Sequence, residues 1–316
     1  MSFSKEIKEE ICSVKEASEE EQKPATEEQQ MAMAYGMLLF SKSFSASAIA
    51  LTTESRAAAA TYSETIAALT GTIVEMRVKL THRRGESKVY TLTVPDRNDC
   101  AGIFDRFGHQ PSQLNLRINR ANIDGENGTA YFLRGVFLVC GSVTNPDKDY
   151  HMEFAVPYKN LAADLERIIS EIDEIKPEPH TIRRQGSYVV YLKGCEVIAD
   201  ILTYIGAPMA ALNMMQSSMM KSLRNRINRR TNSETANLKK TADASARQLI
   251  AIERIRQKQG LASLPADLRE LAEMRLEYPE YNLRELGEAL SVPISRSGVN
   301  HRLQRLMAIA EALNDS

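Results

Sequence analysis

The sequence lacks the residue clusters that build metal sites, disulfide scaffolds and the commonest enzyme active sites. Its four cysteines, Cys12, Cys100, Cys140 and Cys195, lie far apart without a CxxC pair, so neither a zinc site nor a disulfide framework is predicted. The histidines are scattered, and no HxxxH, P-loop, GxGxxG or GxSxG motif is present. We therefore expect no enzymatic activity, no catalytic residue, no metal, no cofactor and no small-molecule substrate.

The sequence also lacks a secretory signal and an uninterrupted membrane span. Residues 1–10 are rich in Lys and Glu and have no apolar core, which favours a cytoplasmic location. Residues 201–220 are uncharged and long enough to span a bilayer, but Gly206 and Pro208 interrupt them. This pattern predicts a helix end, a turn and a new soluble helix, and therefore no membrane partner.

The formal net charge of −1 hides a strong asymmetry along the 316 residues. Residues 1–28 carry nine acids against four Lys, and we expect them to form an acidic N-terminal arm. Residues 209–260 carry eleven Lys or Arg against three acids. A basic stretch of this size suits DNA phosphates, RNA, an anionic membrane or simply a solvated helix surface.

Three sequence features recur in the same order at offsets of 98 to 100 residues, which favours an internal duplication. The paired features are Gly36 and Gly135 within AYGMLLFSKS and FLRGVFLVCGS, the strand-like runs from Val89 and Val189, and the segments 103–108 and 201–206. Any α/β chain yields some matching elements, but three ordered matches are hard to obtain by chance. We expect an α+β fold with duplicated αββαββ units about a pseudo-twofold axis, over residues 29–207, with halves at about 29–108 and 129–207.

The composition of the chain changes after Pro208, from the mixed strands and helices of the duplicated units to a polar, basic and helical pattern. Residues 208–262 are predicted to form a basic helical linker, and residues 263–316 an all-α helix-turn-helix domain. Helices are expected over 267–278, 282–290 and 295–313, with a turn at 291–294 that contains Pro293. An apolar set is predicted to lock the last two helices together: Leu283, Leu286, Leu290, Val292, Val299, Leu303 and Leu306.

The last helix has the composition of a DNA recognition helix. Asn and Arg side chains can bind base edges in pairs of hydrogen bonds, and Ser and Arg can hold phosphates. The candidate DNA-binding residues are Ser295, Arg296, Ser297, Asn300, His301, Arg302, Gln304 and Arg305. No acid lies between residues 295 and 307, although residues 261–316 as a whole hold nine acids against six Arg. The alternative is a small helical oligomerisation module.

A second basic cluster precedes this domain. Its candidate phosphate-binding residues are Lys221, Arg224, Arg226, Arg229 and Arg230. A solvated linker helix would have the same composition, so both interpretations stay open.

The two apolar segments resemble the LAGLIDADG helices of homing endonucleases, in which each helix ends in an acid that binds the catalytic metal. When the helix glycines are aligned, Ser41-Lys42 and Cys140-Gly141 stand where that family has Asp-Gly. Ser41 and Cys140 are therefore degenerate metal positions, because Mg²⁺ prefers carboxylate ligands.

The whole chain resembles the WhiA family of bacterial transcription factors, through MSFSKEIKEEI, FLRGVFLVCGSV and ISRSGVNHRLQRL. It departs from the family at Lys42 and in the acidic stretch 16–28. The resemblance implies a nucleoid-associated, sequence-specific regulator of sporulation, or of cell division and chromosome segregation, that binds double-stranded DNA and does not act as a nuclease. Another transcription factor or RNA polymerase would be its protein partner. The alternatives are a division scaffold acting through protein contacts and an active endonuclease.

Overall fold

The structure is a computed structural model that describes residues 2–13, 25–81, 87–113 and 115–313 of the chain. The chain divides into two compact units, Met1–Lys221 and Ser222–Ser316. Residues 14–24, which belong to the expected acidic N-terminal arm, lie outside the described residues.

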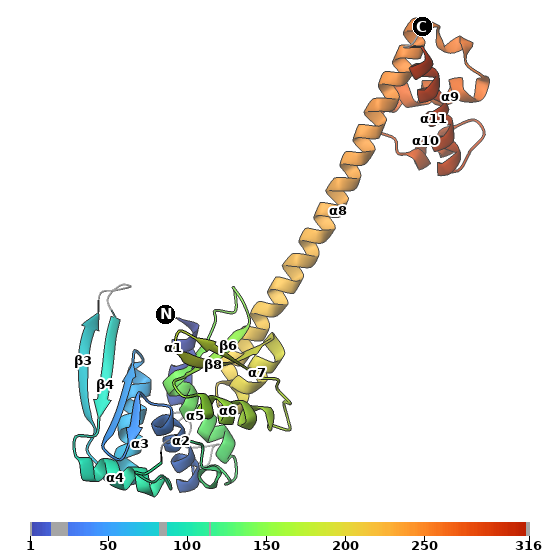
Figure 1. Cartoon of the computed structure of the whole chain (residues 1–316). Helices are drawn as coiled ribbons and strands as arrows, with labels where there is room; N and C mark the ends of the chain where they lie inside the picture. The colour runs from blue at the N-terminus through green and yellow to red at the C-terminus, as the bar shows by residue number, and fades with distance from the viewer. Residues whose placement is uncertain (1, 14–24, 82–86, 114, 314–316) are drawn as a thin grey trace. The chain divides into compact units, whose positions relative to one another are not determined.

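The N-terminal unit contains one arrangement of helices and strands twice (Figure 1). The first copy consists of α2 (Glu27–Leu39), β1 (Ser43–Ser45), β2 (Ala48–Thr53), α3 (Arg56–Thr70), β3 (Glu75–Thr81), β4 (Ser87–Thr93) and α4 (Arg97–Arg106). After the short 3-10 helix η1 (Arg120–Asn122), the second copy consists of α5 (Gly128–Cys140), β5 (Gly141–Val143), β6 (His151–Val156), α6 (Lys159–Ser170), β7 (His180–Arg184), β8 (Ser187–Lys193) and α7 (Cys195–Tyr204). The predicted α+β class and duplicated αββαββ units are confirmed.

The two sheets have the same antiparallel topology, β1-β2-β4-β3 and β5-β6-β8-β7. Side chains alternate between the two faces, as a strand requires. In β6, Met152, Phe154 and Val156 are buried, and Met152 pairs with Leu192 of β8. Each sheet therefore buries one face in a core that both halves share.

Helices α2 and α5 pack against each other at the centre of this unit (Figure 1). A Cβ at Gly36 would lie 2.3 Å from the carbonyl oxygen of Phe132, and a Cβ at Gly135 would lie 2.1 Å from that of Met33. Gly135 lies 99 residues after Gly36, and Phe132 lies 99 residues after Met33, so the two contacts are equivalent. They are the close approach that a pseudo-twofold axis between the two helices requires.

The structure differs from the expected acidic arm over residues 3–13, which form α1 (Phe3–Ser13). Phe3, Ile7 and Ile11 recur every four residues, and all three are buried in the core of the N-terminal unit. The Ser4 hydroxyl donates to the Val143 carbonyl and accepts from the Val143 N–H, both at 2.8 Å. This helix therefore belongs to the folded body.

Helix α8 (Pro208–Lys258) contributes to both units. Ala210, Ala211 and Met214 are buried in the N-terminal core, whereas Ile252 and Ile255 are buried in the C-terminal core. The predicted basic linker is thus a helix with a packed segment at each end. None of the described helices combines the length and the hydropathy needed to cross a membrane.

The C-terminal unit continues through η2 (Leu261–Ser263), α9 (Ala266–Glu277), α10 (Leu283–Ala289) and α11 (Arg296–Ala312). Figure 1 shows these helices packed beside the end of α8. The three predicted helices agree with α9, α10 and α11 to within one residue or two, which is the usual uncertainty of a helix end.

Candidate nucleic-acid interface

Helices α10 and α11 pack across a short turn in the manner of a helix-turn-helix. Of the predicted apolar set, Leu286, Leu290, Val299, Leu303 and Leu306 are buried, and Leu283 is partly buried. The prediction for Val292 is wrong, because its side chain is 72% exposed. Ile294 packs against the core in its place, since its N–H donates to the Gly287 carbonyl at 3.1 Å and turns the chain inward.

Two residues outside the predicted set hold this turn in place. A Cβ at Gly287 would lie 2.4 Å from the Ile294 carbonyl oxygen, so the turn closes only over a glycine. The Glu270 carboxylate of α9 accepts the Ser291 N–H at 2.5 Å, and this hydrogen bond holds the pKa of Glu270 below its usual value. A glycine four residues before the predicted turn was a signal for Gly287 in the sequence. No local pattern indicated Glu270.

Most of the predicted recognition residues are presented to solvent by α11. The helix begins at Ser295, whose hydroxyl accepts the Gly298 N–H at 3.2 Å, as an N-cap does. The exposed candidates are Ser295, Arg296, Ser297, Asn300, His301, Gln304 and Arg305. Within α11 no acid precedes Glu311, so this surface of the helix offers hydrogen-bond donors and positive charge.

An acid from another helix reaches this surface. Asp267 in the first turn of α9 lies 3.5 Å from Nε of Arg302 and 3.8 Å from an Nη of Arg305. The Arg302 side chain is only 25% exposed, whereas that of Arg305 is 50% exposed. Arg302 therefore serves mainly to attach α11 to α9, and Arg305 keeps part of its guanidinium free for another partner.

The five residues of the basic cluster before this domain are not equally exposed to solvent. Lys221 is partly buried in the N-terminal unit, where its Nζ donates to the Pro146 carbonyl at 2.6 Å and lies 4.7 Å from the centre of the Tyr150 ring. Arg224, Arg226 and Arg229 are exposed on α8. Arg230 is exposed as well and pairs with Glu234 at 2.8 Å. The cations available to an anion are thus those beyond Lys221.

The first degenerate metal position, Ser41, is occupied by hydrogen bonds within the protein. Its side chain is buried, and the hydroxyl lies 2.7 Å from the Leu38 carbonyl, to which it donates, and 3.0 Å from that of Ser43. A hydroxyl committed to carbonyl acceptors does not fit the oxygen donor set of Mg²⁺.

The second degenerate metal position, Cys140, carries a neutral thiol. The thiol donates to the Val136 carbonyl at 3.4 Å, and burial raises its pKa to about 12, while the Lys8 ammonium opposes this increase. Burial lowers the pKa of Lys8 itself. Among the residues that the structure describes, no group of three His, Cys, Asp or Glu could hold a metal ion. These positions do not fit a catalytic metal.

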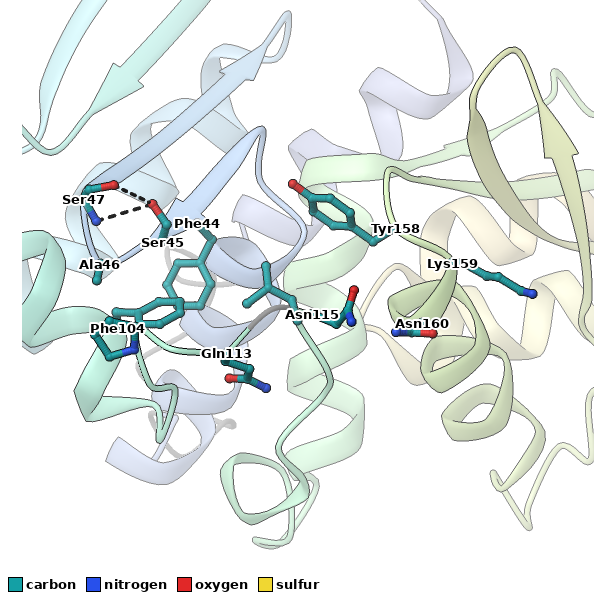
Figure 2. A pocket seen from close by; sticks show the side chains of 12 residues that line it. Phe44, Ser45, Ala46, Ser47, Phe104, Gln113, Asn115, Tyr158, Lys159 and Asn160 are labelled. Atoms are coloured by element: carbon teal, nitrogen blue, oxygen red, sulfur yellow. Dashed lines mark hydrogen bonds between the residues drawn. The ribbon is translucent and has the colours of Figure 1, made fainter.

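A hollow of about 530 Å³ lies between the two halves of the N-terminal unit (Figure 2). Phe44 and Phe104, whose ring centres are 5.1 Å apart, lie on the side of the first half, and Tyr158 and Lys159 come from the second. Lys159 is the one charged residue among the described residues that line it. Acid–base catalysis would need paired carboxylates, and covalent catalysis would need a nucleophile beside its base. The lining of this hollow has neither arrangement.

Two family profiles match the chain. The "WhiA LAGLIDADG-like domain" profile matches residues 129–224, and the "WhiA C-terminal HTH domain" profile matches residues 227–310. Together they cover more than half of the chain.

Curated relatives and a solved structure match over almost the full length. A protein of Clostridium botulinum named "Probable cell division protein WhiA" is 34% identical over 99% of each chain. A protein of Clostridium perfringens with the same name is 36% identical over 99% of this chain and 98% of its own. The crystal structure of full-length DUF199/WhiA from Thermatoga maritima covers 99% of both chains at 24% identity with a TM-score of 0.56, which supports the fold. The chain therefore belongs to the WhiA family.

Proposed function

We propose that this protein is a sequence-specific regulator of transcription that reads double-stranded DNA with α11. The observation that carries the proposal is the exposure of Asn300, His301, Gln304 and Arg305 on a helix whose entry turn is held by Gly287 and Glu270. In a helix-turn-helix, the second helix lies in the major groove, where Asn and Arg pair with base edges. Ser295 and Arg296 at the start of α11 suit the flanking phosphates.

Arg224, Arg226, Arg229 and Arg230 supply the non-specific part of the affinity in this proposal. Arg229 and Arg230 follow Arg226 at spacings of three and four residues, so each is a neighbour of Arg226 on the surface of α8. Cations that neutralise phosphates release counterions, which makes binding depend on salt.

The N-terminal unit does not cut DNA in this proposal. The Ser41 hydroxyl and the Cys140 thiol replace the carboxylates that a catalytic metal needs, and both are engaged with backbone carbonyls. This unit would then add affinity or recruit another transcription factor or RNA polymerase.

The names of the relatives support a particular process as the one that the protein regulates. The Clostridium relatives are named as cell division proteins, which supports a role in cell division and chromosome segregation, with sporulation as the second process. A regulator of this kind acts in the cytoplasm, associated with the nucleoid.

A division scaffold is the second candidate function. Within the N-terminal unit, helix α8 exposes a row of apolar side chains, Leu212, Met215 and Met219, spaced three or four residues apart. An exposed apolar row of this kind is typical of a protein contact.

Chromatin mapping of the protein in cells, followed by footprinting of purified protein on the enriched sites, distinguishes the two functions. A regulator gives discrete peaks and a protected sequence that is lost with Asn300→Ala. A flat map together with no protected site would support the scaffold. Cleavage of DNA that requires Mg²⁺ and stops with EDTA would overturn the proposal that the N-terminal unit does not cut DNA.

A further inference from the structure

The C-terminal unit contains a pocket of about 520 Å³ bounded by α8, the end of α9 and the first turns of α10 and α11. Four cations line it, Lys240, Arg275, Arg284 and Arg296, and its described lining residues include no Asp or Glu. Its volume lies within the range of small-molecule sites, which is about 300–1,000 Å³. Its charge and size suit an anionic ligand smaller than a macromolecule.

Arg275 is a buried cation whose hydrogen bonding is incomplete. The side chain is 2% exposed, and one Nη donates to the Tyr281 carbonyl at 2.6 Å. Its Nε is buried without a hydrogen-bond partner. Burial lowers the pKa of Arg275, and the nearby Glu280 opposes the shift. A guanidinium in this state favours an anion that accepts from its Nε.

Gln248 supplies the complementary unsatisfied group. Its side chain is 7% exposed and lines the same pocket from α8, and its Oε1 is buried without a donor. Two residues that line the pocket therefore carry, respectively, a buried donor that lacks an acceptor and a buried acceptor that lacks a donor. Unpaired polar groups of this kind cost free energy until a ligand or water satisfies them.

Exposed cations of the pocket lining are available to the same ligand. Lys240 and Arg296 are exposed and form no ion pair with any Asp or Glu that the structure describes. Arg284 is already committed to Glu288 at 2.8 Å. Two exposed cations and one buried guanidinium thus surround a single cavity.

We infer that this pocket binds a phosphate ester that also carries a hydroxyl group. The phosphate oxygens accept from Arg275 and pair with Lys240 and Arg296, and the hydroxyl donates to Oε1 of Gln248. The phosphate group itself has two sources, a free ester and the backbone of DNA. The phosphodiester backbone of DNA has no O–H or N–H donor for Gln248, so the free ester is the occupant that satisfies both groups.

This site goes beyond the proposed function because it makes α11 responsive to a ligand. Arg296 and Asn300 line the pocket and also belong to the candidate DNA-binding surface. A ligand that engages Arg296 changes which side chains of α11 remain free for DNA. Ligand binding in the pocket does not require that α11 binds DNA.

The test uses the full chain with three probes at equal ionic strength: sodium chloride, inorganic phosphate and ribose 5-phosphate. Isothermal calorimetry and thermal unfolding are expected to show saturable binding of ribose 5-phosphate, weaker binding of inorganic phosphate and none of chloride. Thr241→Glu places an acid at the edge of the pocket and is expected to weaken binding at least tenfold. Thr235→Glu makes the same change at an exposed position of α8 outside the pocket and should leave binding unchanged.

A second pair of variants keeps the inference testable where Thr241→Glu fails to fold. Lys240→Gln should weaken binding several-fold, while its neighbour Lys239→Gln should not, with circular dichroism to verify folding. Absence of saturable binding to both phosphate probes, or equal effects of the two Thr variants, overturns the inference.

Titration of a short DNA duplex separates the two sources of phosphate. If Thr241→Glu weakens duplex binding while neither free probe binds, the phosphate comes from DNA and the free-ester assignment is wrong. If the parent binds ribose 5-phosphate but no DNA, the proposed function fails and the pocket inference stands.

Discussion

Gly36 of α2 and Gly135 of α5 each bring their helix against the backbone of the other. A Cβ at Gly36 would lie 2.3 Å from the Phe132 carbonyl oxygen and one at Gly135 would lie 2.1 Å from that of Met33. Real Cβ atoms essentially never approach another atom this closely, and the obstructing atoms are backbone. The two glycines therefore set the separation of the two halves of the N-terminal unit.

Gly135→Ala is expected to destabilise the N-terminal unit. Forcing a methyl group into a packed helix contact typically costs about 1–3 kcal/mol, which exceeds the gain of about 1 kcal/mol from the better helix propensity of Ala. Urea unfolding should show a lower midpoint for the transition of this unit. Gly102→Ala in α4 is the matched control, because nothing lies within 4 Å of its added Cβ. That variant should be neutral or more stable, and an equal loss in both would contradict the packing argument.

Sequence preference should depend on the exposed side chains of α11. Asn300→Ala and Arg305→Ala are each expected to cost about 1–3 kcal/mol on the target site and much less on random DNA, because base contacts carry the discrimination. Competition binding with the two DNAs measures the difference. Equal losses on both DNAs would make these side chains phosphate contacts.

Asp267 is expected to restrain DNA binding, because it lies 3.5 Å from Arg302 and 3.8 Å from Arg305. Asp267→Asn frees positive charge on the surface of α11, so affinity for target and random DNA should rise. The slope of log K against log salt should become steeper by about 0.9 for each phosphate gained. Glu273→Gln removes one charge from an exposed position of the same helix and should have a smaller effect. If Glu273→Gln raises the affinity as much as Asp267→Asn does, the effect of Asp267 is one of net charge alone.

The helices and strands were predictable because their signals are local. The alternation of large apolar residues with polar or small ones in His151–Val156 indicates a strand, and the apolar spacing of Leu286, Leu290, Val299 and Leu303 indicates two helices across a turn. Helix α1 was missed as part of the body, although Phe3, Ile7 and Ile11 stand at helical spacing. The acidic composition of that segment was given more weight than its periodicity.

The contacts that define the site were not predictable in the same way. Asp267 lies 35 residues before Arg302, and Lys221 lies 75 residues after Pro146. Pairings of this range depend on how helices pack, and no periodicity in one segment encodes them. The same holds for the pocket that Gln248 and Arg275 share, since each is only one polar residue within a helix.

Cys140 is expected to resist alkylation in the folded protein. Burial raises its pKa to about 12, so at pH 8 far less of this thiol is the reactive thiolate than the roughly one quarter of a free cysteine. Because the folded thiol keeps its proton to higher pH than the unfolded one, this group lowers stability as the pH rises above about 8.5. Labelling with iodoacetamide at pH 8, read by mass spectrometry, should modify Cys140 only after unfolding in urea. Rapid labelling of the native chain would contradict the raised pKa of this thiol.

Arg226, Arg229 and Arg230 are expected to bind phosphates, because they lie exposed on α8 outside the helix-turn-helix. Replacing all three with Gln should weaken binding to target and random DNA alike, and each lost contact should reduce the slope of log K against log salt by about 0.9. The specificity ratio should hold, since phosphate contacts position a protein without specifying a sequence.

Lys221→Gln is the matched comparison for the triple variant. Lys221 is held by the Pro146 carbonyl and the Tyr150 ring, so its replacement should leave the salt slope unchanged. Salt titrations of the parent and both variants, with circular dichroism to verify folding, measure these effects. An unchanged slope in the triple variant would assign the basic segment to a solvated surface, and DNA binding would then depend on α11 alone.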